Sequence, residues 1–204
     1  MVTSEAARVC GPTDIDTVVE ILVDSFYDDT TWSWVFPHPD RRRDQQRVLW
    51  HALASGAMRY PTVWLSAGDT STAVWIPPEG TELSEDQETA LVESMTELLG
   101  DEAPRVLRVF EAFEKAHPKD EPHYLLSLLG TAVAHQGHGY GLRLLAETLK
   151  VVDAEDMPAY LEASNPANVA LYQRYGFELY GSFALPDGGY DVPTMWRRRQ
   201  SERS

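Results

Sequence analysis

The chain has 204 residues and a formal net charge of −15, and 43% of its residues are hydrophobic. This length predicts a single domain, and the negative charge argues against binding to nucleic acids or anionic membranes, because both need a basic face. There is no apolar run of about 18 residues to predict a membrane-spanning helix, no apolar signal region near residue 1 and only one cysteine, Cys10, so we expect a cytoplasmic protein without an internal disulfide.

The spacing of apolar residues and the positions of glycine and proline predict the secondary structure along the chain. The expected elements are a strand at 6–10, a helix at 14–26, a loop at 27–40, a helix to about 60, a hairpin at 62–67 and 72–76, helices at 84–99 and 102–116, a strand at 123–129, a helix to about 155, a strand at 159–163, a helix at 167–175, and strands at 177–185 and 190–197. This order predicts an α+β (mixed α/β) fold in one domain over residues 1–197, followed by a polar, disordered tail at 198–204.

A glycine-rich segment lies between the strand at 123–129 and the helix that follows it. It reads Gln136-Gly137-His138-Gly139-Tyr140-Gly141, without the Gly-Lys-Ser/Thr of a P-loop or the G-x-G-x-x-G of a dinucleotide site. Glycine permits positive φ and close approach of a ligand, and the free N–H groups of a first helical turn favour an anion. The segment predicts a cradle for a pyrophosphate, and the alternative is a helix cap without a ligand.

A second segment, residues 160–177, reads Tyr-Leu-Glu-Ala-Ser-Asn-Pro-Ala-Asn-Val-Ala-Leu-Tyr-Gln-Arg-Tyr-Gly-Phe. The two segments together resemble the GNAT superfamily of acyl-CoA-dependent N-acyltransferases, over about residues 122–197. Within it, the stretches 73–79, 117–122, 135–141 and 161–168 look most like the puromycin N-acetyltransferase group. The resemblance implies a twisted mixed sheet of about seven strands flanked by helices, and acetyl-CoA as the co-substrate.

The resemblance also assigns coenzyme contacts to the end of the central strand, to the cradle and to the start of the short helix. These residues are Leu129, Gly130, Thr131, Gln136, Gly137, His138, Gly139, Tyr140, Gly141 and Asn168. Two departures from the family pattern stand out: residues 131–134 replace a common Val-x-Pro-Asp/Glu, and His138 replaces a frequent Lys or Arg. No metal is expected, because His135 and His138 have no third ligand nearby.

For catalysis, the position of Tyr172 in the family motif implies a general acid for the leaving thiolate, whereas Tyr175 is expected to pack. Glu162 is an acid in an otherwise apolar strand, which costs free energy unless it has a role or a partner. We therefore expect Glu162 to act as a base through water, with a structural hydrogen bond as the alternative. His123 is the other candidate base.

The acceptor pocket is expected near the first two helices, where aromatic residues and acids occur together; its candidate residues are Phe26, Tyr27, Trp32, Trp34 and His123. Such a pocket suits a bulky cationic amine, and the alternative is an ordinary aromatic core. We expect the acceptor to be the primary amine of a small molecule, with antibiotics and other xenobiotics among the candidates. We expect the protein to be a monomer or homodimer. The alternatives are a non-catalytic acyl-CoA sensor and a peptide or protein N-acetyltransferase.

Overall fold

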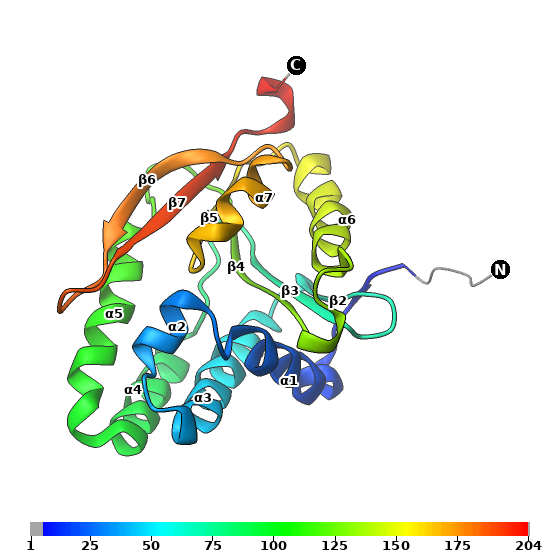
Figure 1. Ribbon diagram of the computed structural model, residues 1–204. Coiled ribbons are helices and arrows are strands. Elements are labelled where there is room, and N and C mark those ends of the chain that lie inside the picture. Colours follow the sequence, from blue (N-terminus) through cyan, green and yellow to red (C-terminus); the bar gives the residue numbers. More distant parts are fainter. Residues whose placement is uncertain (1–5, 204) are drawn as a thin grey trace.

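The computed structural model describes residues 6–203, and in this range seven strands form one twisted sheet (Figure 1). The strand order is β1-β2-β3-β4-β5-β7-β6, and only β4 and β5 run parallel. The strands are β1 (Arg8–Val9), β2 (Val63–Leu65), β3 (Ser71–Ile76), β4 (Tyr124–Thr131), β5 (Ala159–Glu162), β6 (Glu178–Ala184) and β7 (Asp191–Arg197). The predicted fold class and the predicted sheet of about seven strands are confirmed.

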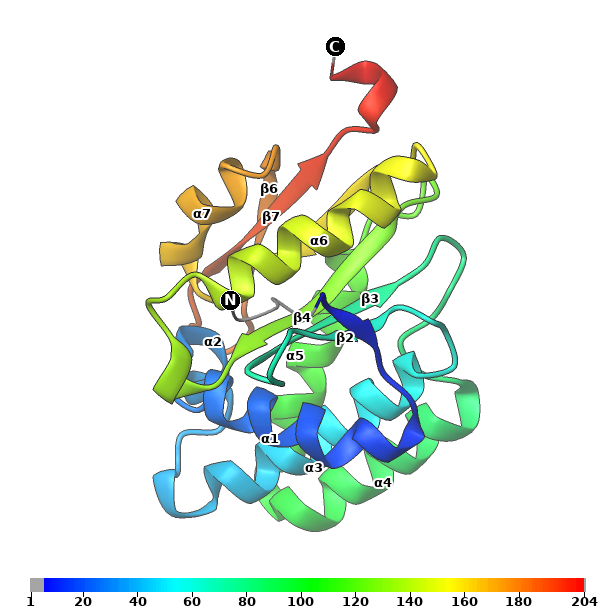
Figure 2. The ribbon, with the colours of Figure 1, turned by 90° about the vertical axis from the view of Figure 1, so that its right-hand side faces the viewer.

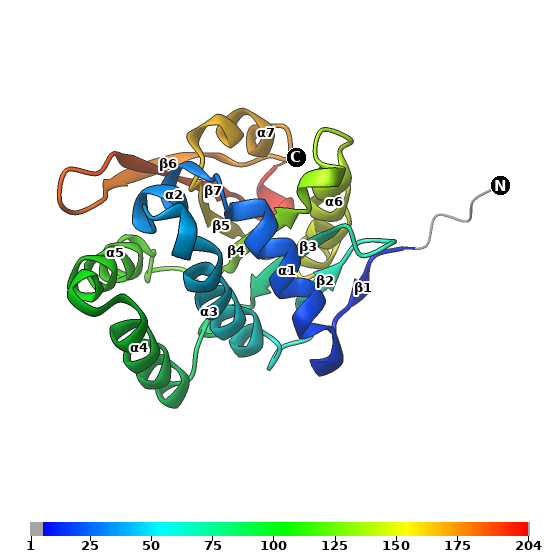
Figure 3. The same ribbon diagram turned by 60° about the horizontal axis from the view of Figure 1, so that its bottom comes forward.

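Helices cover both faces of the sheet (Figures 1 and 2). They are α1 (Ile15–Phe26), α2 (Thr30–Val35), α3 (Pro39–Ala57), α4 (Glu85–Leu99), α5 (Ala103–Ala116), α6 (Tyr140–Ala154) and α7 (Val169–Gln173). One core lies between the sheet and the group formed by α1, α3, α4 and α5, which Figure 3 shows from below. A second core lies under α6, with Tyr172 of α7 packed against it.

Helix α2 lies inside the segment that the sequence predicted as a loop, so that prediction was wrong for residues 30–35. Six residues are too few for a helical periodicity to be visible, and the helix depends on its ends instead. The Asp29 side chain accepts hydrogen bonds from the backbone N–H groups of Thr31 and Trp32 at 3.0 and 3.1 Å. At the other end, Arg105 donates to the carbonyl of Val35 at 2.6 Å and Arg42 to that of Phe36 at 2.7 Å.

The segment that the sequence predicted as a disordered tail is folded against the domain as far as the structure describes it. Gln200–Glu202 form a short 3-10 helix, and Ser201 donates its backbone N–H and its hydroxyl to Asp156 at 2.8 and 2.7 Å. Arg203 binds Asp153 at the end of α6, and Arg197 binds the same carboxylate through two hydrogen bonds. Hydrogen bonds and ion pairs therefore order residues 198–203, although their polarity predicted disorder. Ser204 lies outside the described residues.

Two further features bear on the sequence predictions. Cys10 is half-buried, and burial raises the pKa of its thiol to about 12, which keeps it protonated and unreactive near neutral pH. Within residues 6–203, none of the helices combines the length and the apolar character needed to cross a membrane.

Candidate active site

The sheet opens between its two parallel strands. The strands β4 and β5 pair only at Tyr124↔Ala159 and Leu125↔Tyr160, although β4 continues to Thr131 along its other neighbour, β3. Beyond these pairs, the edge of β4 that faces β5 no longer has β5 as its hydrogen-bonding neighbour. The opening leads from the start of α6 towards the end of β5, so it joins the two segments that the sequence singled out.

The glycine segment forms an exposed loop at the start of α6. Gly137 and Gly139 both have a φ of +76°, and a Cβ added to either would meet no atom within 4 Å. The first i→i−4 hydrogen bond of this region runs from Arg143 N–H to the Gly139 carbonyl at 3.0 Å, so the preceding N–H groups belong to the unpaired first turn of the helix. This arrangement of open space, positive φ and a helix N-terminus fits a pyrophosphate group.

Side chains brace the cradle from within. Gln136 donates to the Thr131 carbonyl at 3.0 Å, and the His138 ring contacts the Gln136 carbonyl at 2.8 Å. The Tyr140 ring lies against His138 and under the guanidinium of Arg143, 4.6 Å from its centroid. In the described part of the chain, no group of three or more His, Cys, Asp and Glu side chains is arranged to hold a metal ion.

The end of β4 differs from the rest of the predicted coenzyme site because its last residue, Thr131, already makes hydrogen bonds within the chain. The Thr131 N–H donates to the Ser25 hydroxyl at 3.2 Å, so this N–H and the Thr131 carbonyl bound by Gln136 both have partners within the chain. Gly141 lies so close to this strand that an added Cβ would be 2.6 Å from Thr131 Oγ1. Gly141 is thus explained by packing, and the coenzyme contacts expected at Leu129 and Gly130 stay predictions.

Tyr172 lies on α7 with its side chain half-buried against the second core, 6.1 Å from the Phe177 ring between centroids. Burial and the nearby Asp29 carboxylate raise the pKa of its phenol to about 12, so the hydroxyl carries its proton at neutral pH. Asn168 makes no side-chain cap for α7, whereas Asn165 caps the turn before it by accepting from Ala167 N–H at 3.0 Å. The side chain of Asn165 therefore caps the 3-10 turn of residues 166–168, and the Asn168 side chain does not cap α7.

Glu162 ends β5 on the face of the sheet that Tyr160 occupies, opposite Leu161, as strand alternation predicted. Burial of its carboxyl group raises the pKa to about 8, like-charge repulsion from Glu82 adds to the rise, and the Tyr160 hydroxyl opposes it. A carboxylate of this kind changes its protonation near neutral pH, as a general base requires.

Two residues near Glu162 were missed by the sequence analysis. Glu82 belongs to the loop between β3 and α4, and Ser127 donates its hydroxyl to the Glu82 carboxylate in a short hydrogen bond. Burial raises the pKa of Glu82 as well. The only signal in the sequence was a serine in an otherwise apolar strand, and nothing near residue 82 distinguished it from the acidic helix that follows.

The predicted acceptor residues separate into different environments. Phe26 and Trp32 are only 9% and 8% exposed, and both contact Trp50 in the first core. The Tyr27 ring contacts two arginines and its hydroxyl donates to the Pro39 carbonyl at 3.1 Å. His123 is buried among rings; burial lowers its pKa, and its Nε2 atom has no partner among the described residues. The five residues do not form one pocket.

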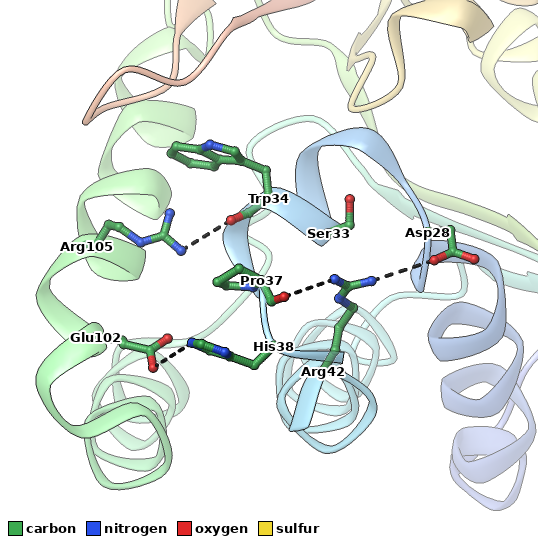
Figure 4. A pocket seen from close by; sticks show the side chains of 8 residues that line it. All are labelled: Asp28, Ser33, Trp34, Pro37, His38, Arg42, Glu102 and Arg105. Atoms are coloured by element: carbon green, nitrogen blue, oxygen red, sulfur yellow. Dashed lines mark hydrogen bonds and ion pairs between the residues drawn. The ribbon is translucent and has the colours of Figure 1, made fainter. Parts of the chain in front are cut away.

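Trp34 lines a polar depression of about 700 Å³ between α2, α3 and α5 (Figure 4). The other lining residues are Asp28, Ser33, Pro37, His38, Arg42, Glu102 and Arg105. Both arginines direct donors at the last carbonyls of α2, and Glu102 pairs with Arg41 at 3.0 Å. The depression includes neither Tyr172 nor Glu162, so we place the candidate active site at the opening between β4 and β5.

The chain is similar to known acetyltransferases. The acetyltransferase (GNAT) family matches residues 72–177. An uncharacterized N-acetyltransferase of Schizosaccharomyces pombe is 30% identical over 84 residues, which make up 41% of this chain and 34% of that protein, so the match spans about a third of the relative.

Solved structures share the fold over nearly the whole chain. One, from Corynebacterium glutamicum, is described as histone acetyltransferase HPA2 and related acetyltransferase; it has a TM-score of 0.67 and 22% identity, with 97% of each chain covered. A polyamine N-acetyltransferase of Drosophila melanogaster has a TM-score of 0.64 and 14% identity, with 95% and 99% covered. A mosquito arylalkylamine N-acetyltransferase-like protein has a TM-score of 0.58 and 17% identity, with 95% and 99% covered. The chain belongs to the GNAT acetyltransferase family.

Proposed function

We propose that this protein transfers an acetyl group from acetyl-CoA to a primary amine of a small molecule by direct attack in a ternary complex. The observation that carries the proposal is the opening between β4 and β5, which has the glycine cradle at one end and the half-buried carboxyl of Glu162, with its raised pKa, at the other. Structural neighbours with names that refer to polyamine, agmatine and arylalkylamine acetyltransferases support a small amine as the acceptor.

The residues divide the chemistry as follows. The N–H groups of residues 137–141 hold the pyrophosphate, and Asn168 contacts the coenzyme beside it. Leu129 and Gly130 align the pantetheine arm along the free edge of β4. Glu162 takes one proton from the ammonium of the acceptor through water, which leaves the nitrogen lone pair free to form a bond to the thioester carbon.

The remaining proton transfers balance the reaction. As the carbon–sulfur bond breaks, Tyr172 gives its proton to the sulfur, whose charge builds up only late in the step. The nitrogen then loses a second proton, which restores the Tyr172 phenol, and Glu162 releases its proton to solvent. One ammonium and one thioester thus yield one amide, one thiol and one proton.

Acidic groups favour a cationic acceptor at this site. Glu162 and Glu82 lie together, Asp29 lies near Tyr172, and the whole chain carries a net charge of −15. The resemblance to the puromycin group makes antibiotic-like amines reasonable members of this class, and we propose a cytoplasmic monomer or homodimer.

The first experiment is titration calorimetry with acetyl-CoA, free CoA and ATP, followed by a thiol-release screen over amines. The panel contains alkylamines, diamines, agmatine, arylalkylamines, puromycin and a lysine-containing peptide. We expect binding of acetyl-CoA and CoA, little binding of ATP, and acetylation of at least one small amine. Coenzyme binding without transfer to any amine would favour a sensor, and acetylation of the peptide alone would favour protein acetylation.

A further inference from the structure

Glu82 reaches the candidate active site from outside the sheet, on a loop that is fixed at several points. The Arg59 guanidinium donates to the Thr81 carbonyl at 2.7 Å, and the Thr81 N–H donates to the Tyr60 hydroxyl at 3.1 Å. The backbone of Glu82 lies directly against Gly56 of α3, where a Cβ would collide with the Glu82 carbonyl. The structure therefore holds Glu82 in one place by contacts that do not involve its carboxyl group.

The partner of Glu82 lies at an irregularity of β4. In the pairing of β3 with β4, Val74 opposes Leu128 and Trp75 opposes Leu126, which leaves Ser127 as the extra residue of a β-bulge. Bulges redirect side chains, and the Ser127 hydroxyl here donates to the Glu82 carboxylate. A β-bulge and a fixed loop are thus both used to place one carboxyl group.

The register puts this carboxyl group beside Glu162. The last pair between the parallel strands is Leu125↔Tyr160, so Ser127 and Glu162 each lie two residues further along their strands. Ser127 of β4 and Glu162 of β5 therefore lie opposite each other across the opening. Glu82, which Ser127 binds, is close enough to Glu162 for like-charge repulsion between the two carboxyls.

In the described part of the chain, no lysine, arginine or histidine forms an ion pair with either carboxyl group, and the nearby Arg59 guanidinium binds the Thr81 carbonyl instead. Among the described residues, the other charged or polar groups that act on the two carboxyls are Ser127 of β4, Tyr160 of β5 and Glu114 of α5. Glu114 is itself paired with Lys119, at 2.8 Å. Two neighbouring half-buried carboxyls without an ion-paired cation cannot both be ionised at low cost, so the pair binds a proton more tightly than either group alone.

We propose that Glu82 is a positioning residue that shares one proton with Glu162 and thereby selects an acceptor with an aliphatic ammonium group. This inference rests on the proposed acetyl transfer. With one proton on the pair, the site carries a single negative charge, which matches the single positive charge of an ammonium group. An arylamine is neutral near pH 7, so it gains nothing from this charge and has no ammonium proton to give to Glu162.

The test that does not depend on turnover is carboxyl titration by NMR in protein labelled with ¹³C at the glutamate side-chain carboxyl. In the wild type we expect two coupled titrations, one of them near or above neutral pH. In Glu162→Gln the coupling should be lost, so that Glu82 titrates in a single step at lower pH. In Glu82→Gln the titration of Glu162 should move down by about one pH unit or more, because the like charge is gone. An unchanged titration in that variant would overturn the proposal.

The kinetic test follows kcat/KM against pH for an aliphatic amine that the screen identifies. Glu82→Gln should move the acidic limb to lower pH by about one unit and keep the preference for an alkylamine over an arylamine, because Glu162 then carries the single negative charge alone. Glu82→Gln combined with Glu162→Gln should lower that preference by about tenfold, while KM for acetyl-CoA stays the same. Glu82→Ala is a second variant without the charge, and Glu88→Gln on the exposed face of α4 is the matched control. A uniform loss of kcat without a shift of the profile would mean a structural role only.

The two tests separate the two proposals. If the wild type acetylates no amine, the proposed function fails, yet the NMR titration still decides whether the carboxyls share a proton. If amines are acetylated but Glu162 titrates as an ordinary glutamate, the acetyl transfer stands and the pairing with Glu82 is wrong. Coenzyme binding by calorimetry shows that each variant is folded.

Discussion

The cradle and the carboxyl pair are two parts of one candidate site that are built in opposite ways. The cradle uses the backbone of residues that adjoin in the chain, is exposed, and depends on two glycines with positive φ. The pair uses side chains from three distant segments, is half-buried, and depends on the hydrogen bond from Ser127 to Glu82 and one close approach of backbones. A site built from the backbone of one continuous segment can be recognised as a sequence motif, whereas a site assembled from side chains of distant segments cannot.

The comparison also indicates how each part responds to change. Substituting a cradle side chain leaves the N–H groups in place, so coenzyme binding should fall only when the glycine geometry changes. Substituting a buried carboxyl changes a charge in a poorly solvated place, where each interaction is strong. We therefore expect the largest effects at the reacting groups and the smallest in the cradle.

The largest effect is expected for Tyr172→Phe, which removes the proton for the leaving sulfur. It should lower kcat by roughly 10²-fold or more and leave the affinity for CoA nearly unchanged. Thiol-release kinetics and calorimetry measure the two quantities, and Tyr175→Phe serves as the neighbouring control. Full activity in Tyr172→Phe would remove the acid role from this residue.

The next effect concerns stability and comes from the raised pKa of Glu162. The folded state binds this proton more tightly than the unfolded state, where the pKa is about 4.5, so the stabilisation is fully present below that pH and is lost as pH rises through about 8. Without ligands, the contribution of Glu162 to the free energy of unfolding should fall by about 3 kcal/mol between pH 5 and 8. Urea titrations of the wild type and Glu162→Gln measure the difference; equal slopes against pH would contradict it.

Acids with a lowered pKa change the stability in the opposite sense, and they titrate below the range from pH 5 to 8. Hydrogen bonds from Arg8 hold the pKa of Asp14 down at about 2, and Arg197 and Arg203 lower the pKa of Asp153 against the effect of burial. Carboxylates with a lowered pKa stabilise the fold above their unfolded pKa and lose that effect as pH falls. Their contribution is therefore constant above pH 5.

In the range from pH 5 to 8 the raised pKa values of Glu82 and Asp29 act in the same sense as that of Glu162. The lowered pKa values of His117 and His123 act in the opposite sense. The comparison with Glu162→Gln is therefore what isolates the contribution of Glu162.

A smaller effect is expected for Gly139→Ala in the cradle. A residue with a Cβ at a φ of +76° costs about 1 kcal/mol or somewhat more, so CoA should bind about tenfold more weakly. Gly188→Ala introduces the same strain at a φ of +82° in the loop between β6 and β7 and is the matched control. Equal CoA affinity in the two variants would show that the loop holds no ligand.

The smallest effect is expected for His138→Arg, which adds the positive charge frequent in the family. An exposed charge contributes on the order of 0.5 kcal/mol, so CoA affinity should rise two- to threefold at low salt. The gain should vanish in 1 M salt, where the Debye length is about 3 Å. A gain that persists in high salt would indicate a change of loop shape instead of charge attraction.

The sequence predicted nearly every strand of the sheet and nearly every helix that covers it, because the apolar residues of long amphipathic segments recur with a clear periodicity. It also singled out the glycine segment, Tyr172 and Glu162 through contiguous motifs, and their roles stay predictions. It missed α2, which depends on Asp29, Arg42 and Arg105 at its ends, and it missed Glu82, whose partner Ser127 is 45 residues away. It could not separate the buried ring of Trp32 from the half-buried ring of Trp34, since both lie in the same short helix.

The contacts of α2 bear on how an acceptor can enter. Thr31 donates its hydroxyl to the Ser164 carbonyl at 2.6 Å and accepts from the Tyr190 hydroxyl at 2.9 Å, while Ser164 donates to Asp29 at 3.0 Å. Helix α2 is thereby fastened to the exit of β5 and to the loop before β7. Such a helix cannot swing open as a lid, so we expect acceptors to be admitted by the resting shape of the entrance, at a rate set by diffusion and charge.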